Sequence, residues 1–468
     1  LTELRVEMQE NPVGIGTLIP RFSWQISTHK GGVMQKAYQI IVAETEKGLK
    51  NASSVMWQSD KVYSDQSVLV KYGGSPLESG KRYFWQVKVW TNKGEECISK
   101  IQHWDMALLK PSDWRGKWIG LDNERIPEDE HGRTTVPACY LRKEFRVNAP
   151  VKRAMLYVCG LGSSYFYING QAISDDVFGP LPTLYDKTTM FLTYDVTKLL
   201  DEGINVIGGA LGNGRYCGLR GIGYPLHFGL PTLIAQLVIE NDAGKLVVVS
   251  DETWKVTNKG PIRANNEFDG EIYDARMELG DWTKSGYDDS GWQKVDIMSA
   301  PTQMLCAQTS PCIKVMEEIV PISIKKVDKN RCIIDMGQNM AGWLKVSLKG
   351  KKGQPVTLRF AESLQAEGDE LYVANLRTAK STDVYIPAQD GNFKWEPIFV
   401  YHGFRFVEVS GVDYTPSVSD FTGKVIYDQM RTIGSFECSN ILLNQIYTNA
   451  YWGLRGNNRG MPTDCPLI

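Results

Sequence analysis

Alternating apolar and polar positions recur along most of the chain, which is the pattern of β-strands buried on one face. The alternation is clearest over residues 81–90, and shorter runs occupy residues 22–26 and 37–43. Several short strands within about 100 residues are typical of an immunoglobulin or fibronectin-like sandwich. Residues 1–110 are therefore predicted to form a first β-sandwich domain.

A second, larger region of short apolar runs extends over residues 111–300. Asn169-Gly170 separates two of these runs, and this dipeptide favours a tight hairpin because both of its residues adopt positive φ. Residues 246–250 and 254–256 are predicted to pair with each other across the acidic turn between them. We interpret the region as a second sandwich, of the jelly-roll type.

A third region, residues 301–430, continues the alternation. Residues 344–348 and 356–360 each place apolar side chains on one face, and a segment rich in Gly and Lys separates them. Such a pattern predicts a hairpin and, with its neighbours, a third β-sandwich. The fold class is therefore mainly β, with sandwich domains in tandem.

Near the C-terminus the spacing of apolar residues changes to that of a helix. Leu442 and Ile446 lie one turn apart, Ser439 is the predicted N-cap and Gly456 the predicted end. The apolar face of such a helix must cover something, yet no second helix is predicted in the sequence. We therefore expect residues 431–468 to begin a helical domain inside which the chain stops.

Composition narrows the classes of function. The 468 residues carry 52 Lys and Arg against 54 Asp and Glu, a formal net charge of −2, so no excess of charge favours nucleic acid or an anionic membrane as partner. No apolar run approaches the roughly 18 residues that span a bilayer. The 13 Trp and 21 Tyr suit β-sheets and also sugar-binding surfaces.

General catalytic motifs are absent from the sequence, which has no phosphate-binding loop signature and no His-Glu-x-x-His. The nine cysteines are scattered without a Cys-x-x-Cys pair, which argues against a disulfide framework and against a zinc site. We expect most of them to be small buried residues. Candidate chemistry is left to acidic and aromatic side chains and to a few others.

Five residues stand out, and each has a plainer structural alternative. Asp175 and Asp176 follow the Asn-Gly turn, where acidic pairs are usually turn caps or solvated charges. Asn213 precedes a glycine, as turn residues often do. His402 lies between two predicted strands, and a packed histidine and a site histidine are equally favoured. Asp464 follows the predicted helix and has the alternative of a solvated charge.

Several segments in collinear order together make the chain similar to the bacterial α-L-rhamnosidases of glycoside hydrolase family 78. Each motif is short, but the ordered set is specific and covers essentially the whole chain. The segments that carry the resemblance are residues 11–15 with 20–24, 165–171, 185–187, 211–216, 335–343, 401–406 and 436–466.

The resemblance implies that residues 431–468 begin an (α/α)6 barrel, which hydrolyses terminal α-L-rhamnosides of plant glycosides or polysaccharides with inversion. Inversion needs a general acid, a general base and room for a water molecule. Asp464-Cys465-Pro466 matches the family's Asp-Cys-Pro, whose aspartate contacts the sugar, and His402 is the second candidate for substrate binding. The family's Asp-Glu-Arg triplet, which supplies the acid, is absent, as is the base, so the chain is expected to be inactive alone.

The resemblance also implies a binding role for the jelly roll. Some family members carry a calcium-dependent rhamnose-binding jelly roll, so Asp175 and Asp176 are candidate calcium ligands, since this ion prefers hard oxygen donors. Asn213 and Tyr216 are candidate sugar contacts. No cofactor is required for the hydrolysis, and calcium is the one ion that the resemblance suggests.

Two rival functions stay open. The chain could be a non-catalytic rhamnose-binding protein, or a structural or adhesion protein, although adhesion has no need of the terminal helix or the Asp-Cys-Pro loop. It is also either a fragment of a full rhamnosidase or a natural short protein that keeps only the β modules. The fragment is favoured, because a helix without partners leaves its apolar face wet.

The sequence says less about the cellular compartment of the protein than about its fold. The chain begins at Leu1 rather than at Met, so a leader or initiator is expected to have been removed. A polysaccharide substrate slightly favours the periplasm or the cell exterior over the cytoplasm, whereas unpaired cysteines suit a reducing compartment. The sequence does not indicate the oligomeric state, the linkage or the aglycone.

Overall fold

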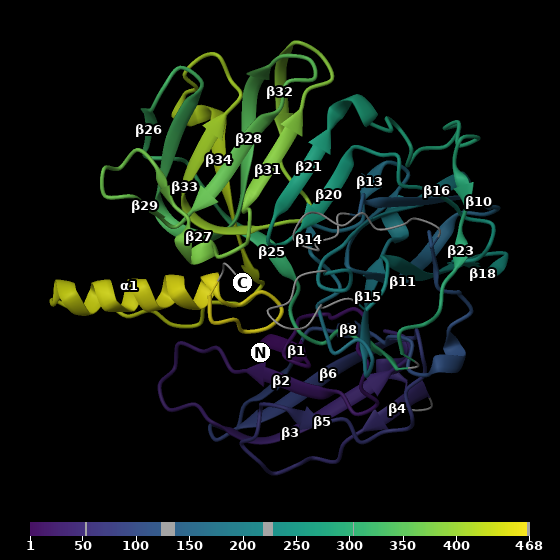
Figure 1. Cartoon of the computed structure of the whole chain (residues 1–468). Helices are drawn as coiled ribbons and strands as arrows, with labels where there is room; N and C mark the ends of the chain where they lie inside the picture. Colours follow the sequence, from purple (N-terminus) through teal and green to yellow (C-terminus); the bar gives the residue numbers. More distant parts are fainter. Residues whose placement is uncertain (52–53, 123–135, 219–227, 303, 466–468) are drawn as a thin grey trace.

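The computed structural model describes residues 1–51, 54–122, 136–218, 228–302 and 304–465. Figure 1 shows an N-terminal β region, a central one and a C-terminal one packed around a common junction, with helix α1 (Ile441–Gly456) projecting outward. Both chain termini lie near this junction (Figure 1), where Arg431 forms an ion pair with Glu3 at 2.5 Å. The mainly β fold class is confirmed.

The N-terminal region is a two-sheet sandwich with an aromatic core. On strand β6 (Arg82–Thr91), the side chains that alternate along one face are all buried, which confirms the predicted alternation: Tyr83, Trp85, Val87 and Val89. Phe22 packs between the sheets, with its ring centroid 4.7 Å from that of Trp85. One sheet contains β1 (Thr2–Val6), β2 (Arg21–Gln25) and β5 (Val70–Lys71); the other contains β3 (Gln35–Ala43), β4 (Val55–Gln58), β6 (Arg82–Thr91), β7 (Glu96–Ile98) and β8 (Gln102–Asp105).

The central region is a jelly roll whose two sheets enclose a core of aliphatic residues with Trp254. Its first sheet runs β13 (Gln171–Ala172), β12 (Ser163–Ile168), β16 (Gly203–Gly212), β10 (Cys139–Val147), β19 (Lys255–Thr257), β22 (Gln293–Lys294). Its second sheet runs β23 (Asp296–Ile297), β9 (Ile119–Gly120), β17 (Thr232–Asn241), β11 (Val151–Leu161), β15 (Thr189–Asp195), β24 (Leu305–Ala307), with β18 (Gly244–Val249) paired to β17.

One hairpin prediction in the jelly roll is confirmed and one is wrong. Asn169 and Gly170 have φ of 51° and 84° and turn β12 into β13. The predicted pairing of residues 246–250 with 254–256 does not occur. Instead β18 pairs with β17, and β19 pairs with β10 in the opposite sheet, because the acidic turn carries the chain across the sandwich. Periodicity identified both strands but not their partners.

The third region is built on one long, curved sheet. Its order is β14 (Asp176–Val177), β25 (Ile313–Ile319), β34 (Phe421–Asp428), β27 (Arg331–Gly350), β33 (His402–Ser410), β28 (Val356–Ala361), β31 (Thr382–Ile386), β21 (Gly270–Asp274), β20 (Ile262–Asn266). β26 (Ser323–Lys326) and β32 (Gly391–Trp395) also pair with β27, and β29 (Ser363–Leu364) pairs with β30 (Leu371–Tyr372).

The predicted hairpin between residues 344–348 and 356–360 is wrong, because the first segment pairs with β34 and β32, whereas the second pairs with β33 and β31. Both segments are nevertheless strands with apolar residues buried on one face, as expected. Sheet pairing also crosses residue 300 of the sequence. Hairpin β20–β21 and the short β14 precede that residue, yet they extend the third sheet, with β21 parallel to β31 (Figure 1).

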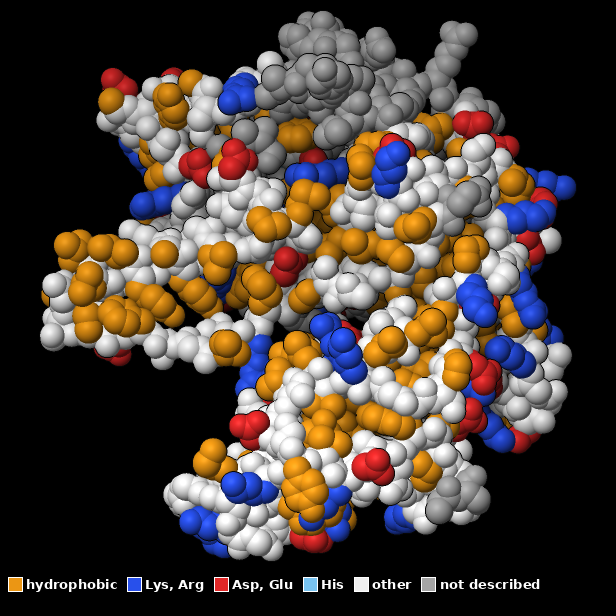
Figure 2. All heavy atoms as spheres, turned by 90° about the horizontal axis from the view of Figure 1, so that it is seen from below, with side chains coloured by type: hydrophobic (Ala, Val, Ile, Leu, Met, Phe, Trp, Pro, Cys, Tyr) orange, Lys and Arg blue, Asp and Glu red, His pale blue; other side chains and the backbone are white. Residues whose placement is uncertain are grey.

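Helix α1 ends at Gly456, as predicted, but its N-cap is Asn440 rather than Ser439. The Asn440 side chain accepts hydrogen bonds from the amides of Leu442 and Leu443 at 2.9 and 3.3 Å, which satisfies two free donors of the first turn. Leu442 is 66% exposed, and Figure 2 shows apolar side chains gathered on the surface of the projecting helix. The apolar face predicted from the sequence therefore has no cover along most of its length.

The cysteines form no disulfide in the structure. Cys139, Cys159, Cys217 and Cys332 are buried, while Cys97 is exposed. Within the described ranges, no helix has the length and apolar character needed to cross a membrane. The 3-10 turns are Gly48–Lys50, Pro111–Asp113, Thr197–Leu199, Ala275–Met277, Ala374–Leu376 and Val418–Asp420.

Hairpin β20–β21 buries a carboxyl group where the second and third regions meet. The Glu271 side chain is fully buried, and its Oε2 accepts hydrogen bonds from the amides of Ile398 and Phe399 at 3.2 and 3.0 Å. The Glu271 amide donates to Asp383 Oδ1 at 2.9 Å. Burial raises the pKa of Glu271 to about 8, with a smaller contribution from the Asp383 charge.

The close approach of β21 to β31 makes Gly270 a test of this junction. Gly270 has φ of +110°, and a Cβ there would lie 2.0 Å from the Thr382 carbonyl oxygen. We expect Gly270→Ala to lower the free energy of unfolding by about 2–5 kcal/mol, through backbone strain and overpacking together. Gly391→Ala, at φ +123° in open space, should show the strain alone, about 1–3 kcal/mol. Equal losses in urea denaturation would contradict the tight contact.

The raised pKa of Glu271 predicts a pH-dependent stability. Between its ordinary pKa of 4.5 and its folded pKa of about 8, the folded state holds the proton more firmly than the unfolded state. The stabilisation is complete below the first value and is lost as pH rises through the second. We expect urea denaturation at stepped pH to show a loss of about 1–4 kcal/mol across this window.

The matched variants separate this effect from other titrations. Glu271→Gln should flatten the slope because the neutral amide does not titrate and its oxygen can still accept the two amides. Glu367→Gln, at an exposed glutamate, should retain the slope of the wild type. A slope that persists in Glu271→Gln would assign the pH dependence to another group.

Candidate functional site

The segment that follows α1, residues 457–465, forms a folded loop that carries Asp464; we call it the post-helix loop. The Gly460 amide donates to Asp428 Oδ1 at 2.6 Å, and the Asp428 amide donates to the Asn458 carbonyl at 3.0 Å. The Thr463 amide donates to the Asn457 carbonyl at 2.9 Å. These bonds attach the loop to the end of β34, and the Asp464 carboxylate is exposed at its far end.

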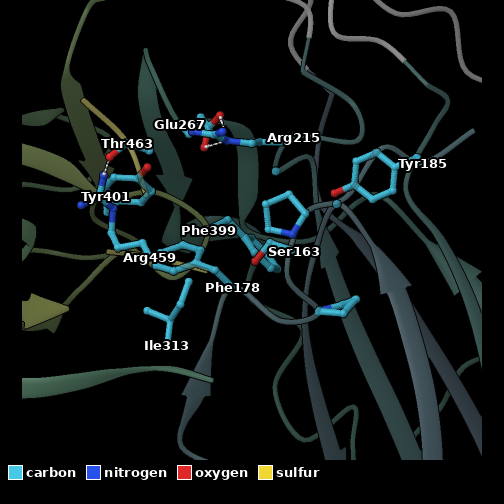
Figure 3. A pocket seen from close by; sticks show the side chains of 14 residues that line it. Ser163, Phe178, Tyr185, Arg215, Glu267, Ile313, Phe399, Tyr401, Arg459 and Thr463 are labelled. Atoms are coloured by element: carbon cyan, nitrogen blue, oxygen red, sulfur yellow. Dashed lines mark hydrogen bonds and ion pairs between the residues drawn. The ribbon is translucent and has the colours of Figure 1, made fainter. Parts of the chain in front are cut away.

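Arg459 braces the post-helix loop from within. The residue is only 5% exposed, and its guanidinium lies over the ring of Tyr401, 4.5 Å from the centroid. The guanidinium donates to the Gly456 carbonyl and to Thr463 Oγ1; Figure 3 shows Arg459 beside Thr463 and Tyr401. One side chain thus joins the end of α1, the residue before Asp464 and the third region.

A small pocket of about 50 Å³ lies beside this brace, where the jelly roll, the third sandwich and the post-helix loop meet (Figure 3). Arg215 crosses one wall and pairs with Glu267, with 3.1 Å between Nε and Oε1. A bound water requires roughly 10–15 Å³ of such space, so the pocket holds a few waters and not a whole sugar ring. Its lining includes Ser163, Phe178, Tyr185, Phe399 and Tyr401.

His402 is packed in the interior. Its Nε2 lies 3.0 Å from Asp383 Oδ1, and its Nδ1 lies 3.2 Å from Ser381 Oγ. The ring stacks on Phe360 with 4.2 Å between centroids. Because His402, Asp383 and Ser381 are all buried, the structure favours the packed alternative. Contact of His402 with a substrate stays a prediction, and the burial of the side chain does not support it.

Asn213 and Tyr216 are also buried in the structure. The Asn213 side-chain amide donates to the main-chain carbonyls of Asn265 and Val136 at 2.8 and 3.2 Å. Tyr216 packs edge-on against Tyr185, with centroids 5.1 Å apart. Both residues stabilise the loop that leaves β16, and their predicted sugar contacts stay predictions.

Asp175 and Asp176 have a common cationic partner. Lys314 Nζ lies 2.5 Å from Asp175 Oδ1 and 3.5 Å from Asp176 Oδ1, and the Tyr194 hydroxyl donates to Asp176 at 3.1 Å. The hydrogen bond from Lys314 holds the pKa of Asp175 below its ordinary value. In the part of the chain that the structure describes, no three His, Cys, Asp or Glu side chains gather to form a metal site.

Sequence reasoning identified Asp464 but missed the groups that hold it. Tyr401 belongs to residues 401–406, one of the segments that carry the family resemblance. No local sequence pattern indicates that its ring contacts Arg459, 58 positions away. Asp428 is likewise the last residue of an ordinary strand. The remaining residues of the predicted Asp-Cys-Pro motif and its sequel, 466–468, lie outside the described residues.

Comparison with known proteins finds domains of bacterial α-L-rhamnosidases over most of the chain. Four domain models match in order: the Rha78A-like N-terminal immunoglobulin domain over residues 1–110, the α-L-rhamnosidase N-terminal domain over 149–317, the bacterial α-L-rhamnosidase concanavalin-like domain over 325–427 and the six-hairpin glycosidase domain over 431–468.

Individual proteins that are similar to this chain are also α-L-rhamnosidases. An α-L-rhamnosidase from Formosa agariphila is 38% identical over 98% of this chain and 50% of its own length. The solved structure of an α-L-rhamnosidase from Dictyoglomus thermophilum has a TM-score of 0.93 and 35% identity, covering 99% of this chain and 53% of that one.

A third relative carries a ligand. The structure of the Streptomyces avermitilis α-L-rhamnosidase complexed with L-rhamnose has a TM-score of 0.93 and 27% identity, covering 99% of this chain and 61% of that one. The chain spans about half the length of the curated relatives it matches. The four matched domains in unbroken order, with the backbone shared throughout, show that the chain belongs to the bacterial α-L-rhamnosidases.

Proposed function

We propose that the protein carrying this chain is an inverting α-L-rhamnosidase that releases terminal L-rhamnose from plant glycosides or polysaccharides. The observation that carries the proposal is Asp464, which stands exposed on a braced loop directly after the first helix of the matched glycosidase domain. A substrate of this class favours the periplasm or the cell exterior.

Asp464 suits a role in holding the sugar. An ionised carboxylate accepts charge-assisted hydrogen bonds from hydroxyl groups, and two such bonds fix the orientation of a pyranose ring. The exposed Asp464 forms no ion pair that would occupy its oxygens in the described structure. Protonation of the leaving oxygen and activation of water belong to two other carboxyl groups of an inverting hydrolase, and we assign neither role to Asp464.

Similarity to the relatives supports rhamnose as the sugar. The Streptomyces avermitilis enzyme of the same backbone was solved with L-rhamnose. A non-catalytic rhamnose-binding protein is the alternative, and turnover separates the two. Binding of L-rhamnose without hydrolysis of any rhamnoside would favour that alternative.

The activity is tested with the complete gene product that contains these residues. We expect release of nitrophenol from 4-nitrophenyl α-L-rhamnoside and none from 4-nitrophenyl β-D-glucoside, and proton NMR should show the inverted anomer as the first product. Asp464→Asn should lower kcat/KM by about 100-fold or more, because hydrogen bonds to sugar hydroxyls strengthen in the transition state. Asp242→Asn, at an exposed residue of the β17–β18 turn, should match the wild type.

Calcium dependence is a separate question, and the Lys314 contacts argue against it. A calcium ion at Asp175 and Asp176 would have to displace an ammonium group that already forms an ion pair with both carboxylates. We therefore expect millimolar calcium, added after treatment with a chelator, to leave the thermal unfolding midpoint unchanged. A rise that disappears in Asp176→Asn would restore the calcium site at this pair.

A further inference from the structure

Two arginines of the C-terminal segment are buried against the third sandwich, and they hold different parts of it. Arg455 belongs to the last turn of α1, lies 4.4 Å from the centroid of the Tyr427 ring and pairs with Glu317 at 2.9 Å. Its side chain contacts no residue of the post-helix loop in these interactions. Arg455 therefore anchors the helix.

Arg459 instead connects parts of the loop with one another. Its guanidinium donates to the Gly456 carbonyl, where the loop leaves the helix, and to Thr463 Oγ1, directly before Asp464. Its position over the Tyr401 ring holds the guanidinium against the third region. The side chain thus connects the last residue of α1 with Thr463, the neighbour of the exposed carboxylate.

The loop needs such a brace because it has little regular structure: one isolated β-bridge joins Asn458 and Pro462, and the described loop holds no helix or longer strand. Loops without helical or sheet hydrogen bonds open at low free-energy cost, and the main-chain bonds of the post-helix loop end at Thr463. The Asp428 carboxylate fixes Gly460 in the middle of the loop, but the described structure shows no comparable main-chain anchor for Asp464 itself. The position of its carboxylate therefore depends on how Thr463 is held.

We propose that Arg459 is a positioning residue, which places Asp464 for its contact with the sugar through Thr463 and Tyr401. The inference rests on the proposed function, since Arg459 acts on the sugar only through Asp464 of the same site. A loss of Arg459 contacts shifts or loosens Asp464, and displacements of about 1 Å in a site cost up to about 100-fold in rate.

The chain offers a matched pair of substitutions for the test. Arg459→Met and Arg455→Met each remove a buried guanidinium from an aromatic ring, so both should lower the thermal unfolding midpoint. Below that midpoint we expect Arg459→Met to lower kcat/KM by about 10–100-fold, and Arg455→Met to stay within about 3-fold of the wild type. Arg459→Lys keeps the charge over Tyr401 and should recover part of the loss.

A double variant decides whether Arg459 acts through Asp464. Added to Asp464→Asn and assayed at high enzyme concentration, Arg459→Met should change kcat/KM by less than about 3-fold, since residues acting as one unit are strongly non-additive. Full additivity would overturn the inference. So would wild-type activity in Arg459→Met, or an equal loss in Arg455→Met.

Hydrogen exchange gives a readout that does not depend on catalysis. The amides of Gly460 and Thr463 should exchange faster in Arg459→Met than in Arg455→Met, and unchanged exchange would overturn the brace by itself. If the wild type hydrolyses no rhamnoside, the proposed function fails, and the role assigned to Arg459 in catalysis fails with it. An active wild type with an unaffected Arg459→Met overturns the positioning role alone.

Discussion

The burial of Glu271 between the second and third regions is the constraint on which the geometry of the candidate site depends. Its Oε2 holds the amides of Ile398 and Phe399, two residues before Tyr401. The ring of Tyr401 in turn carries the Arg459 guanidinium, which reaches Thr463 beside Asp464. A carboxyl group on hairpin β20–β21 is therefore connected by a chain of contacts to the carboxylate proposed to bind sugar.

Asp383 gives His402 a place in the same arrangement. One oxygen, Oδ1, accepts the Glu271 amide and also lies 3.0 Å from His402 Nε2. A buried polar group is costly unless its hydrogen bonds are made, so hairpin β20–β21 and the strand that begins at His402 are fixed relative to each other. The segment around His402 helped to reveal the family, and its contribution in the structure is to hold β33, β31 and hairpin β20–β21 of one sheet together.

The sequence predicted what local pattern controls and missed what distant contacts control. The buried stripe on β6, the Asn169-Gly170 turn and the end of α1 follow from side-chain periodicity and backbone preference. The partners of β28 and the cap of α1 do not. β28 pairs with β31 and β33, which come later in the chain, and two adjacent polar residues, Ser439 and Asn440, compete for the cap position. Asp464 was found only through a motif; its brace joins residues that no periodicity connects.

The placement of Asp464 on a loop, and not on α1, explains why the β regions matter to the site. A carboxylate on the helix would be fixed by helical hydrogen bonds, whatever lay beneath. On the post-helix loop its position depends instead on how the loop is held. Gly460 donates to Asp428 of β34, Arg459 lies over Tyr401, and Glu271 of hairpin β20–β21 holds the segment before Tyr401. The packing of the β regions against one another therefore positions the post-helix loop, and with it the Asp464 carboxylate.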